Sequence, residues 1–182
     1  MNLIKTKLDG LVVLKPTVFK DNRGYFMESY NQKNINKLLG NVNFVQDNES
    51  ESSRGVLRGL HFQKPPYTQA KLVRCLKGSV LDVVLDLRKD SKTYGIFETI
   101  SLTEENKKQL FIPKGFAHGF IVLSKSAIFS YKVDNYYNPD SESGVLWSDL
   151  DLNIDWKINK NEIIVSEKDK NLPTFNEIIN PF

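Results

Sequence analysis

The only two histidines of the chain, His61 and His118, each lie in an apolar run that contains glycine, residues 55–63 and 113–120. Histidine exchanges protons near neutral pH and also binds metals, so both side chains are candidates for chemistry. The alternative is a structural histidine, which is the commoner role in a β protein. Two glycines in the first run would weaken a strand unless a bulge or a close backbone approach required them, which favours a site around His61.

Arg58 lies three residues before His61, and in a regular strand side chains three apart point to opposite faces. The two side chains can share a site only if the pleat is broken between them. Gly59 makes such a break easy, because a bulge inserts one extra residue and often uses glycine. We therefore expect an irregular strand here that turns both side chains toward one ligand.

Acid–base chemistry also needs a proton donor and a positive group near the developing negative charge. Tyr131 shares the inward face of the strand-like run 127–133 with three apolar residues, so its hydroxyl is a candidate acid. The alternative is a core aromatic whose hydroxyl bonds to the backbone. Lys71 begins another run and is a candidate cation, although lysines at strand ends are usually solvated.

A metal site in a β-barrel needs three or four converging histidine, cysteine or carboxylate ligands. The two histidines are far apart in the sequence, and Cys75 is the only cysteine. Its apolar neighbours predict a buried thiol rather than a disulfide or a ligand. We therefore expect no metal and no cofactor, and general acid–base chemistry in their place.

Short apolar or alternating runs with turn signals between them predict strands over much of the chain. A fold of many short strands is a sandwich, a jelly roll or a small barrel, because sheet faces and edges must be covered. The expected strands after residue 70 are 81–87, 96–102, 109–112, 117–123 and 128–133. In the first of these, Asp82 and Asp86 alternate with apolar residues, as in a strand with one buried face.

Other segments are predicted to be a helix, turns and an irregular tail. Residues 32–39 have a helical apolar face, and Gly40 can end the helix at positive φ. Lys77–Ser79 reads as a hairpin turn, and Pro113–Gly115 as a type II turn. Residues 137–182 are rich in polar and turn-forming residues, so we expect an irregular segment anchored on the core by its two tryptophans.

The bulk properties exclude several classes. A chain of 182 residues with 40% hydrophobic residues suits one globular domain, 1–182. The formal net charge of +3 is spread along the chain, so no polybasic block predicts binding to nucleic acid or membrane. No apolar run approaches the roughly 20 residues of a membrane-spanning helix, and the N-terminus lacks an apolar signal sequence, so we expect a cytoplasmic protein.

Several motifs follow one another in a fixed order along nearly the full length of the chain: DNRGYFMESY (21–30), FVQDN (44–48), SRGVLRGLHFQ (53–63), KLVR (71–74), PKGFAHGF (113–120), YKVDNYY (131–137), DW (155–156) and SEKD (166–169). Together these segments resemble the dTDP-4-dehydrorhamnose 3,5-epimerase family. This resemblance implies an all-β, cupin-like jelly-roll barrel with a short helix and an irregular C-terminal segment. It also implies a homodimer whose N-terminal segment, about residues 1–50, contributes to the neighbouring active site.

The resemblance assigns roles by position. His61 matches the proton-abstracting base, Asp169 the carboxylate that orients it, Tyr131 the acid and Lys71 the cation beside the enolate oxygen. The substrate would be a dTDP-linked 4-keto-6-deoxy sugar. The positions that match substrate-binding residues are Arg23, Phe26, Glu28, Gln46, Asp47, Asn48, Arg58, His118, Tyr137, Glu142 and Lys168.

One departure is Glu49, where many family members carry histidine, and this leaves fine specificity open. Close relatives of the family include epimerases that invert C3 only or C5 only. Two further readings are a sugar-nucleotide-binding protein without catalysis and a metal-dependent cupin enzyme. The presence of both base and acid argues against the first, and the scarcity of histidine against the second.

Overall fold

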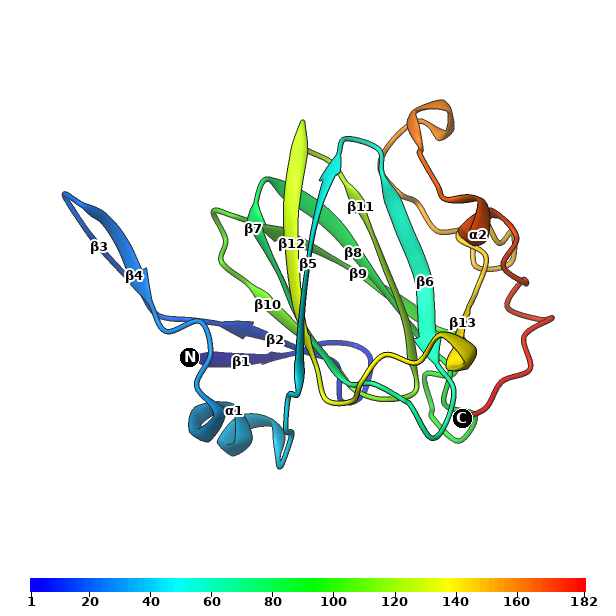
Figure 1. The fold of residues 1–182 in the computed structure, drawn as a ribbon, viewed down its shortest axis with the longest axis horizontal. Helices are drawn as coiled ribbons and strands as arrows, with labels where there is room; N and C mark the ends of the chain where they lie inside the picture. Colours follow the sequence, from blue (N-terminus) through cyan, green and yellow to red (C-terminus); the bar gives the residue numbers. More distant parts are fainter.

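The computed structural model describes residues 1–182 as two facing β-sheets with an N-terminal arm and a C-terminal segment (Figure 1). The six-stranded sheet has the order β1-β2-β10-β7-β12-β5, and the five-stranded sheet has the order β13-β6-β11-β8-β9. The strands are β1 (Asn2–Lys5), β2 (Val12–Lys15), β3 (Val18–Asp21), β4 (Gly24–Met27), β5 (Gln46–Ser53), β6 (Leu57–Gln63), β7 (Lys71–Lys77), β8 (Ser79–Asp86), β9 (Phe97–Thr103), β10 (Gln109–Ile112), β11 (Phe116–Val122), β12 (Ser126–Val133) and β13 (Glu142–Gly144). This architecture confirms the predicted all-β, cupin-like jelly roll.

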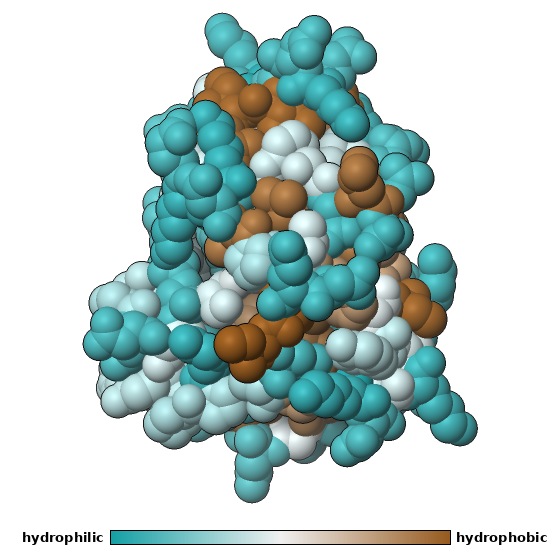
Figure 2. Space-filling model, turned by 90° about the vertical axis from the view of Figure 1, so that its right-hand side faces the viewer, coloured by the Kyte–Doolittle hydropathy of each residue, from teal (hydrophilic) through white to brown (hydrophobic).

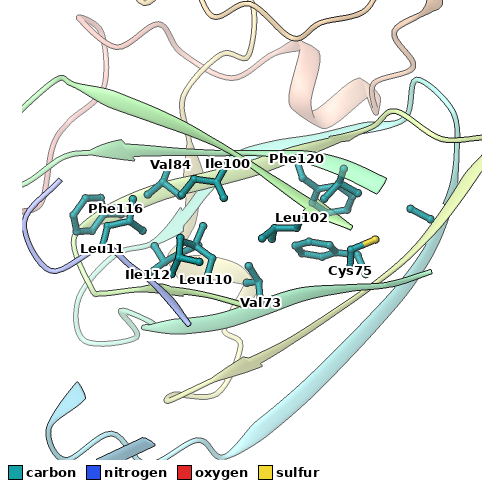
Figure 3. Packing of buried hydrophobic residues seen from close by; sticks show 14 of the residues in the cluster. Leu11, Val73, Cys75, Val84, Ile100, Leu102, Leu110, Ile112, Phe116 and Phe120 are labelled. Carbon is teal, nitrogen blue, oxygen red and sulfur yellow. The ribbon is translucent and has the colours of Figure 1, made fainter. Parts of the chain in front are cut away.

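Apolar side chains from both sheets fill the space between them. Figure 3 shows Val84 and Phe120 of the five-stranded sheet facing Val73 and Leu110 of the six-stranded sheet. Cys75 is also buried in this core, as its neighbours predict. Because the core fills one part of the interior, the remaining part between the sheets is left for a cavity.

The outer faces of both sheets are also covered. The helix α1 (Gln32–Leu39) packs Ile35 against the six-stranded sheet, within the range predicted for it. Gly40 follows it with φ +82° and bonds its N–H to the carbonyl of Asn36. On the other side, the C-terminal segment packs on the five-stranded sheet, with Trp156 buried and Trp147 partly buried as anchors.

That C-terminal segment holds a 3₁₀ turn at Lys160–Glu162 and one helical turn, α2 (Glu167–Lys170), and another 3₁₀ turn, Pro139–Ser141, precedes β13. Viewed from this side, the molecule shows mainly hydrophilic side chains with separate apolar patches between them (Figure 2). No helix in the structure has the length and apolar character to span a membrane.

Two sequence predictions about β8 are wrong. Asp82 and Asp86 are fully buried, because one face of β8 looks into the core and the other lies under the C-terminal segment. The turn at Lys77–Ser79 does not close a hairpin, because β7 and β8 belong to different sheets. Gly78 turns the chain between the sheets at φ +76°, where a Cβ atom would lie 2.1 Å from the Ser126 carbonyl oxygen.

The strands β3 and β4 form a separate hairpin that projects from the body of the molecule (Figure 1). Its aromatic side chains are exposed, with Phe19 63%, Tyr25 54% and Phe26 71% accessible. An arm that exposes several aromatic residues is typical of a protein–protein contact.

Candidate active site

A cavity of about 610 Å³ opens between the two sheets beside the packed core, whose Phe120 and Phe129 form part of its wall. A second hollow of about 300 Å³ shares four of its lining residues, so the two form one two-lobed site. The shared residues are Asn48, His61, Lys71 and Tyr131. His61 belongs to the five-stranded sheet and the other three to the six-stranded sheet.

The expected break in β6 is present and explains how Arg58 and His61 reach the same cavity. On the neighbouring strand β11, His118 pairs with His61 and Phe120 pairs with Arg58. The paired positions are therefore two residues apart on β11 but three residues apart on β6. This difference means that β6 contains one extra residue, which is a β-bulge. Because His118 and Phe120 share a face, their two partners do as well, and both line the cavity.

Gly59 permits this arrangement by close approach to β11 rather than to a ligand. It has φ +126°, and a Cβ atom there would lie 2.4 Å from the Gly119 Cα atom and 2.8 Å from the His118 carbonyl oxygen. Any other residue would push the two strands apart. Gly55 is tight for a different reason, because its Cβ atom would lie 2.1 Å from the carbonyl oxygen of Glu162 in the C-terminal segment.

His61 forms a dyad with Asp169, which the helical turn α2 brings over β6. Asp169 Oδ1 lies 2.7 Å from His61 Nε2, and Asp169 Oδ2 accepts a hydrogen bond from the Gly59 N–H at 3.2 Å. Burial acts to raise the pKa of Asp169, but the hydrogen bond and charge of His61 hold that pKa below its ordinary value. An ionised carboxylate on Nε2 leaves Nδ1 of the neutral ring free to accept a proton.

Tyr131 reaches the cavity from β12, with Phe129 beside it as the alternation predicts. Burial raises the pKa of Tyr131, and the positive charge of Arg58 acts in the opposite direction. The phenol therefore carries its proton at neutral pH. No hydrogen-bond partner within the chain holds its hydroxyl, so a backbone-bonded core tyrosine is not what the structure shows.

Lys71 lies at the first position of β7 and points into both lobes, as the expected inward lysine does. Burial lowers its pKa to about 8, while the carboxylates of Asp82 and Glu142 act to raise it. Next to it, His118 Nε2 lies 2.9 Å from Asp82 Oδ2. Burial lowers the pKa of His118, which therefore is a neutral imidazole at neutral pH.

Arg58 is held by Ser52, whose Oγ accepts hydrogen bonds from Arg58 Nε at 3.3 Å and Nη2 at 3.2 Å. Ser52 and Ser50 belong to the inner face of β5, a strand with no apolar residue. The Ser50 Oγ atom is buried on the cavity wall without a hydrogen-bond partner in the chain. A buried hydroxyl left unpaired is a candidate contact for a ligand.

The second lobe is bordered by a chain of polar contacts. Tyr137 Oη donates to Glu142 Oε2 at 2.6 Å, and Lys168 Nζ forms an ion pair with the same oxygen. Burial acts to raise the pKa of Glu142, but these two contacts lower it below its ordinary value. Gln46 lies nearby and donates to Asn48 at 2.9 Å.

Four residues of the expected substrate site lie outside this cavity in the single chain. Arg23 pairs with Asp21 on the arm, and Phe26 of the same arm is exposed. Glu28 follows the arm and accepts hydrogen bonds from Asn31 and Asn34. Asp47 points to the outer face of β5, where it pairs with Lys132 at 2.8 Å.

Asp82, Ser50 and Ser52 are not among the residues that the sequence predicts for the site. Asp82 alternates with apolar residues like a solvent-facing position, and the only signal against this was its strand's high apolar content. The two serines lie in a stretch, QDNESESS, that has no apolar residue to mark it as a strand. Only its pairing with β12 along the full length makes it one.

The chain contains no group of three or more histidine, cysteine, aspartate or glutamate side chains placed to hold a metal ion. Cys75 lies in the core, where burial raises its thiol pKa to about 11. The fold and the cavity therefore define a jelly-roll protein with a histidine–carboxylate pair, a protonated tyrosine and a partly buried lysine converging on one ligand site.

Comparison with known proteins places this site in a family. The family model described as dTDP-4-dehydrorhamnose 3,5-epimerase matches residues 5–177. The dTDP-4-dehydrorhamnose 3,5-epimerase of Escherichia coli K12 is 50% identical, over 98% of this chain and 97% of that protein. The crystal structure of the Elizabethkingia anophelis enzyme of the same name superposes with a TM-score of 0.94 at 54% identity, covering 99% of this chain and 98% of that one.

The 3,5-epimerase of Legionella pneumophila, solved in complex with dTDP-4-keto-L-rhamnose, has a TM-score of 0.93 and 46% identity, covering 97% of this chain and 94% of that one. These likenesses define the class as sugar-nucleotide epimerases, which are isomerases. The chain belongs to the dTDP-4-dehydrorhamnose 3,5-epimerase family. The family resemblance drawn from the sequence motifs is thereby confirmed.

Proposed function

We propose that the chain converts dTDP-4-dehydro-6-deoxy-D-glucose to dTDP-4-dehydro-L-rhamnose by inverting C3 and C5, in the synthesis of dTDP-L-rhamnose. The observation that carries this proposal is the placement of His61 and Tyr131. They come from opposite sheets and line one cavity, so a sugar between them meets a base on one side and an acid on the other. Family membership supplies the substrate class.

The C4 carbonyl acidifies the protons on C3 and C5, and removal of either leaves an enolate. In the proposed mechanism His61 takes the proton, with Asp169 stabilising the imidazolium that forms. Lys71 lies in the same cavity as the cation that stabilises the enolate oxygen. Tyr131 then protonates the carbon from the opposite face, which inverts it, and the cycle repeats at the second carbon.

The remaining predicted site residues are proposed to bind the diphosphate and nucleoside. Arg58, Lys168 and His118 bring positive or hydrogen-bonding groups to the larger lobe, and Arg58 suits a diphosphate because its guanidinium binds paired oxygens. Gln46, Asn48, Tyr137 and Glu142 surround the smaller lobe. Tyr137 is proposed to stack on the base.

Arg23, Phe26, Glu28 and Asp47 are proposed to complete the binding site of a homodimer. The exposed aromatic arm supports this, because it projects from the body of the chain (Figure 1) and none of its residues lines the cavity of its own chain. We also propose a cytoplasmic enzyme that binds neither nucleic acid nor membrane and uses no metal or cofactor. The dispersed charge and single buried cysteine support that assignment.

The experiment is incubation with dTDP-4-dehydro-6-deoxy-D-glucose in deuterated water, followed by NMR. We expect deuterium at both C3 and C5, and its loss in His61→Ala. Exchange at a single carbon would assign the chain to the 3-only or 5-only epimerases. No exchange under conditions where the ligand binds would refute the acid–base mechanism and support a non-catalytic binding protein.

A further inference from the structure

Arg58 is the only arginine that lines the cavity, and the chain leaves its charge without a carboxylate partner. Arg23, Arg54 and Arg88 each form an ion pair with a carboxylate of the chain, whereas Arg58 forms none. Arg58 is also the one exposed residue of β6. A guanidinium that is accessible and has no counter-charge within the chain is available to an anionic ligand.

The one side chain that holds this guanidinium is Ser52. Its Oγ atom accepts hydrogen bonds from Arg58 Nε at 3.3 Å and from Arg58 Nη2 at 3.2 Å. Ser52 belongs to the six-stranded sheet and Arg58 to the five-stranded sheet, so these bonds join the two walls of the site. Because Ser52 is only 7% exposed, water has little access to compete for its hydroxyl.

The pair of bonds decides which edge of the guanidinium stays free. A guanidinium has five N–H donors in a rigid plane, and its Nε and Nη2 atoms share one edge. Ser52 occupies that edge, which leaves the parallel N–H groups of Nη1 and Nη2 for a ligand with paired oxygens. A serine fixes the plane of the arginine without cancelling its charge, as a carboxylate in the same place would do.

We propose that Ser52 is a positioning residue that fixes the Arg58 guanidinium so that its Nη1–Nη2 edge receives paired oxygens of the nucleoside diphosphate. This inference rests on the proposed function, in which Arg58 binds the diphosphate. Ser52 lines neither lobe of the site, so it acts through Arg58 and does not touch the ligand.

The test is the affinity for dTDP, measured by calorimetry in Ser52→Ala. We expect Kd to rise about 3- to 10-fold, which is the effect of about one lost hydrogen bond. The matched control is Ser53→Ala, because Ser53 is the next residue of β5 but is exposed and forms no side-chain hydrogen bond in the chain. Its Kd should equal that of the native chain, and thermal melting establishes that both variants are folded.

A double-mutant cycle separates positioning from a general structural effect. In an Arg58→Ala background, the further change Ser52→Ala should alter Kd by less than about twofold, because the side chain that Ser52 positions is already gone. A Ser52 that only supported the shape of the cavity would weaken binding equally in both backgrounds. That result, or an unchanged Kd in folded Ser52→Ala, overturns the proposal.

A further readout needs no nucleotide. The Nε–H signal of Arg58 in a nitrogen-15 NMR spectrum, identified by its absence in Arg58→Ala, should exchange with water faster in Ser52→Ala than in the native chain. An equal exchange rate in the two proteins contradicts the role of Ser52. A native chain that binds no dTDP would overturn this inference together with the nucleotide assignment, whereas dTDP binding without deuterium exchange would overturn only the proposed catalysis.

Discussion

Replacing Asp169 by asparagine tests the His61–Asp169 dyad most directly. Asparagine has the size of aspartate, so the contact with the Gly59 N–H and the cap on α2 through Ser166 can be retained. The change removes the negative charge that lies 2.7 Å from His61 Nε2. It also offers an amide N–H in place of a carboxylate oxygen, which favours the tautomer with the proton on Nδ1, where the base must accept one.

The magnitude has two parts. A hydrogen bond to a charged group contributes about 1.5–3 kcal/mol, which corresponds to a loss of about 10- to 150-fold in rate when the imidazolium is no longer stabilised. The wrong tautomer adds to this, up to the roughly 10²- to 10⁴-fold that a general base provides. We therefore expect kcat to fall by about 100-fold or more, with little change in ligand affinity.

The assay is deuterium incorporation at C3 and C5 by NMR, with ligand affinity measured by calorimetry and folding by thermal melting. Glu167→Gln is the matched control, because Glu167 lies in the same helical turn but is exposed and pairs with Lys170. Its kcat should match that of the native chain. A kcat for Asp169→Asn within about threefold of native, in a folded protein, would refute the assignment of His61 as a base oriented by this carboxylate.

Three further predictions concern the acid, the unpaired serine and the β6 bulge. In Tyr131→Phe we expect the rate of inversion to fall about 10²- to 10⁴-fold, while NMR still shows deuterium exchange from the His61 face. An equal loss of inversion and of exchange would contradict the role of Tyr131 as the acid. In Ser50→Ala we expect ligand affinity to weaken by about 0.5–1.5 kcal/mol with no loss of thermal stability, measured by calorimetry and melting; unchanged affinity would remove Ser50 from the site. Gly59→Ala should destabilise the fold by about 1–3 kcal/mol through overpacking against β11, which lowers Tm by several degrees. Gly24→Ala is the control, because Gly24 has a similar φ of +129° but open space around it, and it should lower Tm much less. Equal losses of Tm in the two variants would mean that the positive φ, and not the contact with β11, causes the destabilisation.

The sequence predicts elements well where the apolar period is clear. The helix 32–39 and the strand 109–112 have the predicted bounds, because each shows a face that must be buried. The strand β5 has no such face, since it lies at a sheet edge with one polar side toward the cavity and the other toward solvent. Its conformation comes from pairing with β12, which no local pattern reveals.

The site residues are likewise predictable where they lie in strand-like runs and unpredictable elsewhere. His61, Lys71 and Tyr131 are brought together as their positions in strand-like runs predict, and the break at Gly59 accounts for Arg58. The partnership of His61 with Asp169 followed only from the family resemblance, because a carboxylate in an irregular segment carries no periodic signal. Asp82 is absent from the predicted site for a different reason, because its alternation with apolar residues is that of a solvent-facing position. In the structure its face of β8 looks into the interior, and the C-terminal segment covers the other, apolar face of the strand.

The separation of His61 from Asp169, 108 residues along the chain, has a consequence for the order in which the protein becomes active. During synthesis every strand of both sheets leaves the ribosome before Asp169 does, so the barrel can assemble while its base still lacks a carboxylate. The contacts of Gly55 and Leu57 with residues 162–164 then seat the following turn on β6. The base thus gains its carboxylate only after the strands of both sheets have been made, when the segment that carries Asp169 has been translated.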